Sequence, residues 1–129
     1  MHKGFLKIAA LLGALAVALG AFGAHGLKKL VPLETVSTFE TGVRYQMYHV
    51  FALLIVGILY SHGTQKFLRG AGYCFLAGML LFSGSLYLLT VMKATETVGL
   101  NGVGIITPFG GVFFIAGWLL LVAGLRKAS

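Results

Sequence analysis

Negative charge is almost absent from this sequence. It contains no aspartate and three glutamates, and its 10 lysines and arginines bring the formal net charge to +7. Charged residues of both signs make up 10% of the 129 residues and hydrophobic residues 58%, whereas about 25% of an average soluble domain is charged. A small soluble domain cannot bury so much apolar surface, and a disordered chain would contain far fewer apolar residues. The composition therefore predicts an integral membrane protein.

Cysteine is also scarce, and the usual signatures of catalysis and metal binding are missing. The single Cys74 cannot form a disulfide within the chain, and the sequence has no CxxC, no HExxH and no pair of neighbouring carboxylates. His25 and His49 could clamp a haem or a metal across two helices, but two imidazoles without acidic or cysteine ligands make a weak site. We therefore expect a non-enzymatic protein without metal or cofactor.

The gaps between charged residues predict four membrane-spanning helices in a single domain, 1–129. Residues 8–27, 45–65, 70–92 and 97–125 carry no charged side chain, and a helix needs about 20 mostly apolar residues to cross a bilayer. We expect an all-α, four-helix bundle. A cleavable signal peptide is the alternative for the first run, but that run exceeds the usual signal core of about 7–15 residues, which favours a retained helix. The predicted spans are 5–25, 44–61, 70–92 and 102–125.

The segment between the first two spans, 33–43, has an amphipathic pattern. It follows Pro32, a residue suited to a helix start, and places Val36, Phe39 and Val43 at helical spacing. Two interpretations fit this pattern. The segment is either a short amphipathic helix lying at the outer membrane interface or an extension of the second span.

The basic residues interrupt apolar runs instead of clustering on a polar surface. Membrane lipids, through anionic headgroups, are therefore their expected partners, and nucleic acid is not. With four spans, the N-terminus, the 62–69 loop and the C-terminus share one side, which predicts that both termini are cytoplasmic because that side carries the excess of basic residues. These residues are Lys3, Lys7, Lys66, Arg69, Arg126 and Lys127.

Small residues recur at spacings of four and seven in three of the spans. In lipid, close packing through small residues brings helices together, and a spacing of seven keeps one face toward a partner. The pattern leaves open whether these faces pack within one chain or between subunits. The second span is bulkier, and we expect it to expose more of its surface to lipid. The predicted packing glycines are Gly20, Gly78, Gly84, Gly110 and Gly117.

Polar side chains gather in the predicted outer halves of all four spans. Polar groups inside a membrane are costly and often functional, so we predict an outward-facing polar pocket. The alternative is that the serines and threonines bond to their own helices and the others to headgroups. The stretch Thr107–Gly111, which contains Pro108, is either a helix break lining a cavity or a helical first turn. The predicted pocket residues are His25, Gln46, His49, Ser83, Tyr87 and Thr107.

Four short motifs resemble a known family. They are Gly20–Leu27 (GAFGAHGL), Tyr45–His49 (YQMYH), Phe82–Tyr87 (FSGSLY) and Thr107–Gly111 (TPFGG). In this order they resemble the small bacterial membrane proteins known as domain of unknown function four-two-three, which are similar to eukaryotic transmembrane protein two-five-six. The resemblance covers nearly the whole chain and implies a four-helix plasma-membrane protein with a retained first helix. Members commonly have alanine where this chain has Gly26. The family has no established activity, so no catalytic residues carry over.

Two functional hypotheses follow. The first is an accessory or scaffold component that self-associates as a homo-oligomer or joins a larger membrane complex, because small-residue faces are extensive and no catalytic set is present. The alternative is a small-molecule, lipid or ion-binding or transport protein that uses the outward-facing pocket around His49 and Gln46.

Overall fold

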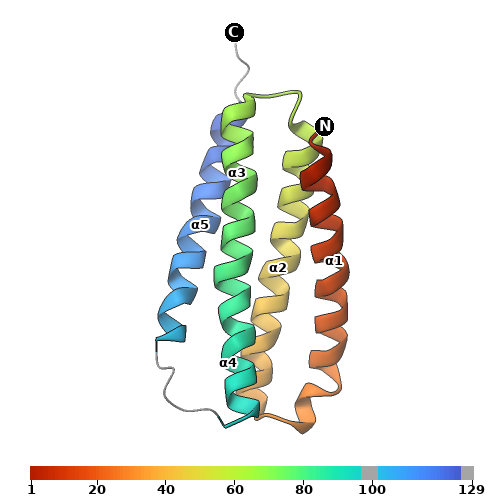
Figure 1. Cartoon of the computed structure of the whole chain (residues 1–129), viewed down its shortest axis with the longest axis vertical. Helices are drawn as coiled ribbons and strands as arrows, with labels where there is room; N and C mark the ends of the chain where they lie inside the picture. Colours follow the sequence, from red (N-terminus) through yellow and green to blue (C-terminus); the bar gives the residue numbers. More distant parts are fainter. Residues whose placement is uncertain (97–101, 126–129) are drawn as a thin grey trace.

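The computed structural model describes residues 1–96 and 102–125, and these residues form helices joined by short turns (Figure 1). The predicted all-α membrane fold is confirmed, since four of the helical segments are long and apolar enough to cross a membrane. Two of the short elements, η2 and α4, continue α3 without a break and complete the third segment. The elements are α1 (Lys3–Ala24), the 3-10 turn η1 (Leu27–Lys29), α2 (Leu33–Leu59), α3 (Gln65–Gly78), the π-helical η2 (Met79–Ser83), α4 (Gly84–Ala94) and α5 (Val103–Gly124).

Helix ends are fixed by local contacts. The imidazole Nδ1 of His2 accepts a hydrogen bond from the Phe5 amide at 3.0 Å and caps α1. At the same end of the molecule, the Thr64 amide donates to the Gly124 carbonyl at 2.9 Å. This bond ties the turn between α2 and α3 to the last turn of α5.

The segment 33–43 is the beginning of α2, not a separate interfacial helix. Helix α2 runs for 27 residues from Leu33 without interruption. Its first turns bury Val36 and Phe39 against Leu27 and Val31, which belong to η1 and the loop after it. The apolar face of the segment is thus covered by protein rather than by lipid. Of the two interpretations of the sequence, the extension of the second span is the one observed.

The four long helices stand side by side in the order α1, α2, α3–α4, α5 (Figure 1). The main interfaces join α1 to α2 and α3 to α5, and α2 contacts α3, η2 and α4 between them. In the most apolar stretch of each span, 44% of residues are buried for α2 and 39% for α3–α4, against 17% for α1 and 22% for α5. The expectation that the second span is the more lipid-exposed one is therefore wrong, because its central place in the row buries it.

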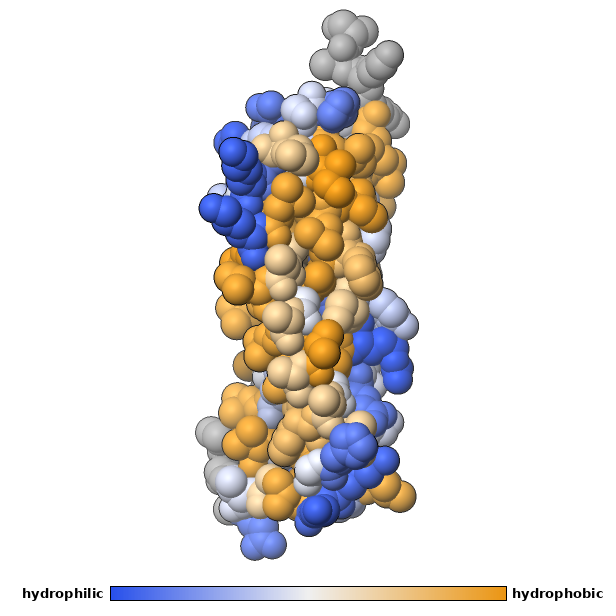
Figure 2. Space-filling view, turned by 90° about the vertical axis from the view of Figure 1, so that its right-hand side faces the viewer, coloured by the Kyte–Doolittle hydropathy of each residue, from blue (hydrophilic) through white to orange (hydrophobic). Residues whose placement is uncertain are grey.

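The two ends of the row carry different elements. We call one end the termini end; it holds the first turn of α1, the α2–α3 turn and the last turn of α5 (Figure 1). The opposite end holds η1, the first turn of α2, the last turn of α4 and the first turn of α5. Figure 2 shows the face that α1 covers, on which hydrophobic residues extend over most of the length and hydrophilic ones lie at the ends and along parts of both edges.

Three of the five predicted packing glycines lie where a side chain would collide with a neighbouring helix. A Cβ atom on Gly78 would overlap the Phe114 ring, and one on Gly117 would stand 2.7 Å from the Phe75 ring. A Cβ atom on Gly110 would stand 2.7 Å from the Cα of Phe82 and closer still to its amide nitrogen.

The other two glycines have more room. A Cβ atom on Gly20 would meet Val43 at 3.5 Å, which is an ordinary contact. Gly84 has no atom within 4 Å of that position. Within the described part of the chain Gly84 faces no neighbouring helix, so the prediction that it packs against one is wrong for contacts inside this chain. Its spacing from Ala77 is helical, but the π turn lies between them and changes the face that Gly84 presents.

Helix α5 continues through Pro108 without a break. Pro108 is the sixth residue of the helix, which places it beyond the first turn, and its nitrogen has no hydrogen to donate to the carbonyl of Gly104. Neither of the two interpretations of Thr107–Gly111 therefore describes the structure. The two glycines after Pro108 instead have different neighbours, since Gly110 is buried against η2 and Gly111 has no atom within 4 Å of a Cβ position.

Candidate functional site

Gln46 joins three of the helices. Its side-chain amide nitrogen donates to the Leu12 carbonyl of α1 at 2.8 Å, and its amide oxygen accepts from the Tyr87 hydroxyl of α4 at 2.6 Å. Gln46 itself lies in α2 and is 4% exposed. A buried amide whose nitrogen and oxygen both have hydrogen-bond partners holds the helices together, because both of its polar ends are satisfied. We call such a side-chain hydrogen bond between two helices a tie.

Two further ties involve serines of the third span. Ser83 donates to the Gly42 carbonyl of α2 at 2.6 Å. The hydroxyls of Ser85 and Thr107 lie 2.6 Å apart and connect α4 with α5. Every buried side-chain nitrogen or oxygen in the described ranges has a hydrogen-bond partner.

The six predicted pocket residues do not share one pocket. Gln46 and Tyr87 bond to each other, whereas Ser83 bonds to α2 and Thr107 bonds to α4. His25 is exposed at the end of α1, where its backbone amide bonds to the Phe22 carbonyl. The placement of these polar groups in the half of the helices away from the termini end was visible in the sequence, but their partners depend on which helices are neighbours.

His49 lies apart from the Gln46 ties, on the side of α2 that faces α5. Its Nδ1 is 2.7 Å from the Tyr45 carbonyl, and its Nε2 is 3.1 Å from the indole nitrogen of Trp118. A carbonyl only accepts and an indole N–H only donates, so the proton is on Nδ1 and the imidazole is neutral. The ring stacks on Phe114 with centroids 3.5 Å apart and planes 6° from parallel.

A groove runs between α2 and α5 beside this histidine. Its volume is about 600 Å³. Phe82 of η2 adds a wall, so the groove lies where the helix has a π turn, a feature often found at functional sites. Its lining is Tyr45, Tyr48, His49, Phe82, Gly111, Phe114, Ile115 and Trp118. We call this the α2–α5 groove.

Sequence reasoning found His49 but missed the aromatic residues around it. Phe114 and Trp118 are four residues apart, and Tyr45 and His49 are also four apart, so each pair shares a helical face. That signal was available in the sequence. The sequence does not indicate, however, that the aromatic face of α2 and that of α5 turn toward each other across the row.

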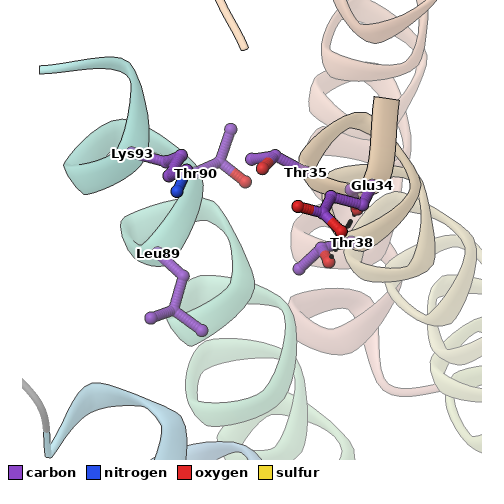
Figure 3. A pocket seen from close by; sticks show the side chains of 6 residues that line it. All are labelled: Glu34, Thr35, Thr38, Leu89, Thr90 and Lys93. Atoms are coloured by element: carbon purple, nitrogen blue, oxygen red, sulfur yellow. Dashed lines mark hydrogen bonds between the residues drawn. The ribbon is translucent and has the colours of Figure 1, made fainter. Parts of the chain in front are cut away.

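A second pocket of about 330 Å³ opens at the opposite end, between the first turns of α2 and the last turns of α4 (Figure 3). An opening with polar walls was expected in this part of the bundle, but its lining differs entirely from the predicted set. It is formed by Glu34, Thr35, Thr38, Leu89, Thr90 and Lys93. We call it the end pocket.

The structure does not assemble a histidine pair for haem or a metal. His25 is exposed beyond the last turn of α1, and His49 is buried with both ring nitrogens engaged. Among residues 1–96 and 102–125, no three histidine, cysteine, aspartate or glutamate side chains lie close enough to hold a metal ion.

Four apolar helices, joined by hydrogen bonds that leave no buried side-chain nitrogen or oxygen unsatisfied in the described ranges, define a four-helix integral membrane protein. The chain belongs to the family described as protein of unknown function (DUF423), which matches residues 19–111. The resemblance in the four motifs is thereby confirmed.

Relatives that match over nearly their full length are likewise described as membrane proteins. The chain is similar to the UPF0382 membrane protein YwdK of Bacillus subtilis, with 41% identity over 97% of this chain and 98% of that protein. It is 41% identical to a UPF0382 membrane protein of Haemophilus influenzae over 100% of this chain and 98% of the relative. A UPF0382 membrane protein of Staphylococcus aureus is 42% identical over 97% of both chains. No solved structure gives a significant match.

Proposed function

We propose that this chain is a non-enzymatic accessory or scaffold protein of the bacterial plasma membrane, and that it self-associates through the α2–α5 groove. The observation that carries the proposal is the groove itself. It is an apolar, largely aromatic hollow between α2 and α5, and the hydrogen-bonded His49–Trp118 pair is part of its lining.

The polar groups near the groove favour a role in helix packing over a role in binding an ion or a polar ligand. Both nitrogens of His49 are engaged in hydrogen bonds within the chain. The amide of Gln46 is engaged with α1 and α4. The contacts of these two residues therefore lend no support to the alternative of an ion or polar-ligand site formed by them. The groove offers a partner ring faces and aliphatic surface.

A second copy of the chain suits the α2–α5 groove. Gly111 in the groove and Gly104, seven residues earlier on the same face, have no atom within 4 Å of a Cβ position, so another helix can approach the α5 backbone closely. Ile115 at the rim is 62% exposed. In a twofold dimer the same surface contributes from both chains, and Ile115 of each copy would fill the groove of the other.

Cysteine crosslinking in native membranes tests this proposal. In a Cys74→Ser background, Ile115→Cys places a thiol at the groove rim, and Leu11→Cys places one on the lipid face of α1. Both positions lie about 12–14 Å from the termini end at ~1.5 Å per residue. We expect oxidation to give a covalent dimer for Ile115→Cys and monomer for Leu11→Cys. Monomer alone at every expression level, or equal crosslinking at both positions, would contradict the proposal.

The proposed orientation places the termini end in the cytoplasm. Supporting it, Lys3, Lys7, Lys66 and Arg69 lie toward that end without an acidic residue, whereas the opposite end mixes four basic residues with three glutamates. Arg126 and Lys127 lie outside the described residues. A membrane-impermeant maleimide applied to intact cells of the Cys74→Ser background should label Glu96→Cys and spare Lys66→Cys. Labelling of both or the reverse pattern would refute the orientation.

A further inference from the structure

The end pocket is built from two helix ends of opposite polarity. Glu34 lies in the first turn of α2, and Lys93 in the last turn of α4. The helix dipole favours an acidic side chain at a helix start and a basic one at a helix end. Each charge is therefore stabilised by its own helix and does not depend on the other.

The two charges face the pocket without pairing. Figure 3 shows Glu34 and Lys93 on opposite walls, with Thr35 and Thr90 between them. Among the described residues, no ion pair within 4.0 Å joins Glu34 to Lys93. The pocket thus offers a positive wall and a negative wall, each with a charge open to a ligand.

Hydroxyl groups and one apolar side chain complete the lining. Thr90 is 3% exposed and donates its hydroxyl hydrogen to the Leu86 carbonyl at 2.8 Å, which leaves its oxygen lone pairs as acceptors. The Thr35 hydroxyl makes no hydrogen bond with any residue of the described ranges, so it can donate to a ligand. Leu89 supplies an apolar surface on the side that leads along α4 toward the middle of the membrane.

The pocket lies at the depth of lipid headgroups. Helix α2 has 27 residues, or about 40 Å at ~1.5 Å per residue, and the hydrocarbon core of a bilayer is about 30 Å thick. The first turn of α2 therefore projects beyond the hydrocarbon. Lys93 is also the first charged residue after the uncharged run 70–92, which places the membrane boundary next to the pocket.

We infer that the end pocket binds the zwitterionic headgroup of a phosphatidylethanolamine lipid, with the phosphate at Lys93 and the ammonium at Glu34. Thr35 donates to the phosphate, and Thr90 accepts from the ammonium. The lipid's acyl chains leave along Leu89 into the bilayer. The inference concerns the opposite end of the molecule from the termini and does not depend on the α2–α5 groove.

The charge pair predicts which headgroup is preferred. Phosphatidylcholine has a phosphate, but its trimethylammonium cannot donate a hydrogen bond to the Glu34 carboxylate. Phosphatidylglycerol has no cation, and its net negative charge is repelled by Glu34. A primary ammonium beside a phosphate is the arrangement that satisfies both walls.

Native mass spectrometry of the delipidated, full-length protein in detergent micelles tests the inference. The three lipids are added separately with identical acyl chains. We expect the first phosphatidylethanolamine to bind about three- to fivefold more tightly than either other lipid, the size typical of solvent-exposed ionic contacts. Glu34→Gln should make phosphatidylethanolamine and phosphatidylcholine equal. Lys93→Gln should weaken phosphatidylethanolamine by a similar factor.

Matched variants and soluble ligands complete the experiment. Glu40→Gln and Lys29→Gln remove exposed charges of the same sign at the same end, outside the pocket, and should bind as wild type. Equal binding of the three lipids by wild type, or a preference that survives Glu34→Gln, would overturn the inference. Glycerophosphoethanolamine and inorganic phosphate should not displace the lipid at equal concentration. Displacement by either would overturn the lipid assignment in favour of a soluble phosphate ligand.

Discussion

Replacing Gly110 by alanine tests the close contact between α5 and the π-helical segment. The new Cβ atom would stand 2.7 Å from the Cα of Phe82 and nearer still to its amide nitrogen, whereas ordinary contacts begin at 3.4 Å. Because the obstructing atoms belong to the backbone, no side-chain rotation can relieve the overlap. Helix α5 must move away from η2, and the move also loosens the Ser85–Thr107 hydrogen bond.

The size of the effect follows from two opposed contributions. Overpacking of a well-packed contact typically costs about 1–3 kcal/mol. Alanine regains up to about 1 kcal/mol over glycine in helix propensity. We expect Gly110→Ala to lower the free energy of unfolding by up to about 2 kcal/mol, and to leave it about 1–3 kcal/mol below that of a glycine-to-alanine change made without a clash.

Gly84→Ala is the matched control, because it makes the same chemical change in a position with no atom within 4 Å. It should leave stability unchanged or raise it by up to about 1 kcal/mol. Reversible unfolding by sodium dodecyl sulfate in dilute mixed micelles measures both variants as monomers. If the two variants unfold at the same detergent fraction, the close approach of α5 to Phe82 is refuted.

The hydrogen bonds between helices give three further predictions. Tyr87→Phe removes the donor to Gln46 and should cost about 0.6 kcal/mol in the same unfolding assay, the average for such bonds in membranes; no change would show that the hydroxyl is not bonded. Gln46→Leu removes both ties at once and should cost more than Tyr87→Phe, and the reverse order would contradict the Leu12 contact. In nitrogen-15 NMR spectra, His49 should show a protonated Nδ1 and a bare Nε2. Trp118→Phe should shift the Nε2 resonance while leaving Nδ1 protonated, and a protonated Nε2 in wild type would refute the assigned tautomer.

The number and position of the spans could be predicted from charge alone. A charged side chain in the bilayer is so costly that the uncharged runs fall on the observed helices: the predicted span 70–92 lies within Gln65–Ala94, and 102–125 brackets Val103–Gly124 by one residue at each end. Helix α2 begins eleven residues before the predicted 44, because an uncharged run marks where Glu34, Glu40 and Arg44 end and not where the helix itself starts.

The burial of α2 could not be predicted from its side chains. Bulky residues such as Leu53 and Val56 suit lipid as well as a protein core, since lipid chains are as apolar as leucine. Both residues are 0% exposed in the structure. Residue size indicates how closely two helices can approach, whereas burial depends on which helix stands in the middle of the row.

The hydrogen-bond partners of the polar residues could not be predicted from the sequence for a related reason. Gln46 and His49 are three residues apart and so share a broad face of α2, but they still differ by about 60° around the helix axis. That difference points Gln46 at α1 and α4 and His49 at α5. The periodicity of a sequence defines the direction of a helix face only within an angle wider than the roughly 60° that separate Gln46 from His49.

The π turn at Met79–Ser83 makes this protein sensitive to the length of its third span. The turn sets the rotation of α3 relative to α4, so that Gly78 meets Phe114 while Ser85 reaches Thr107. Deleting one residue there would rotate one half by about 100° against the other, and the two contacts could no longer form together. Point substitutions at lipid-facing Leu80, which is 74% exposed, leave that rotation intact. Across evolution, this stretch should therefore accept changes of residue at its lipid-facing positions and resist insertions and deletions.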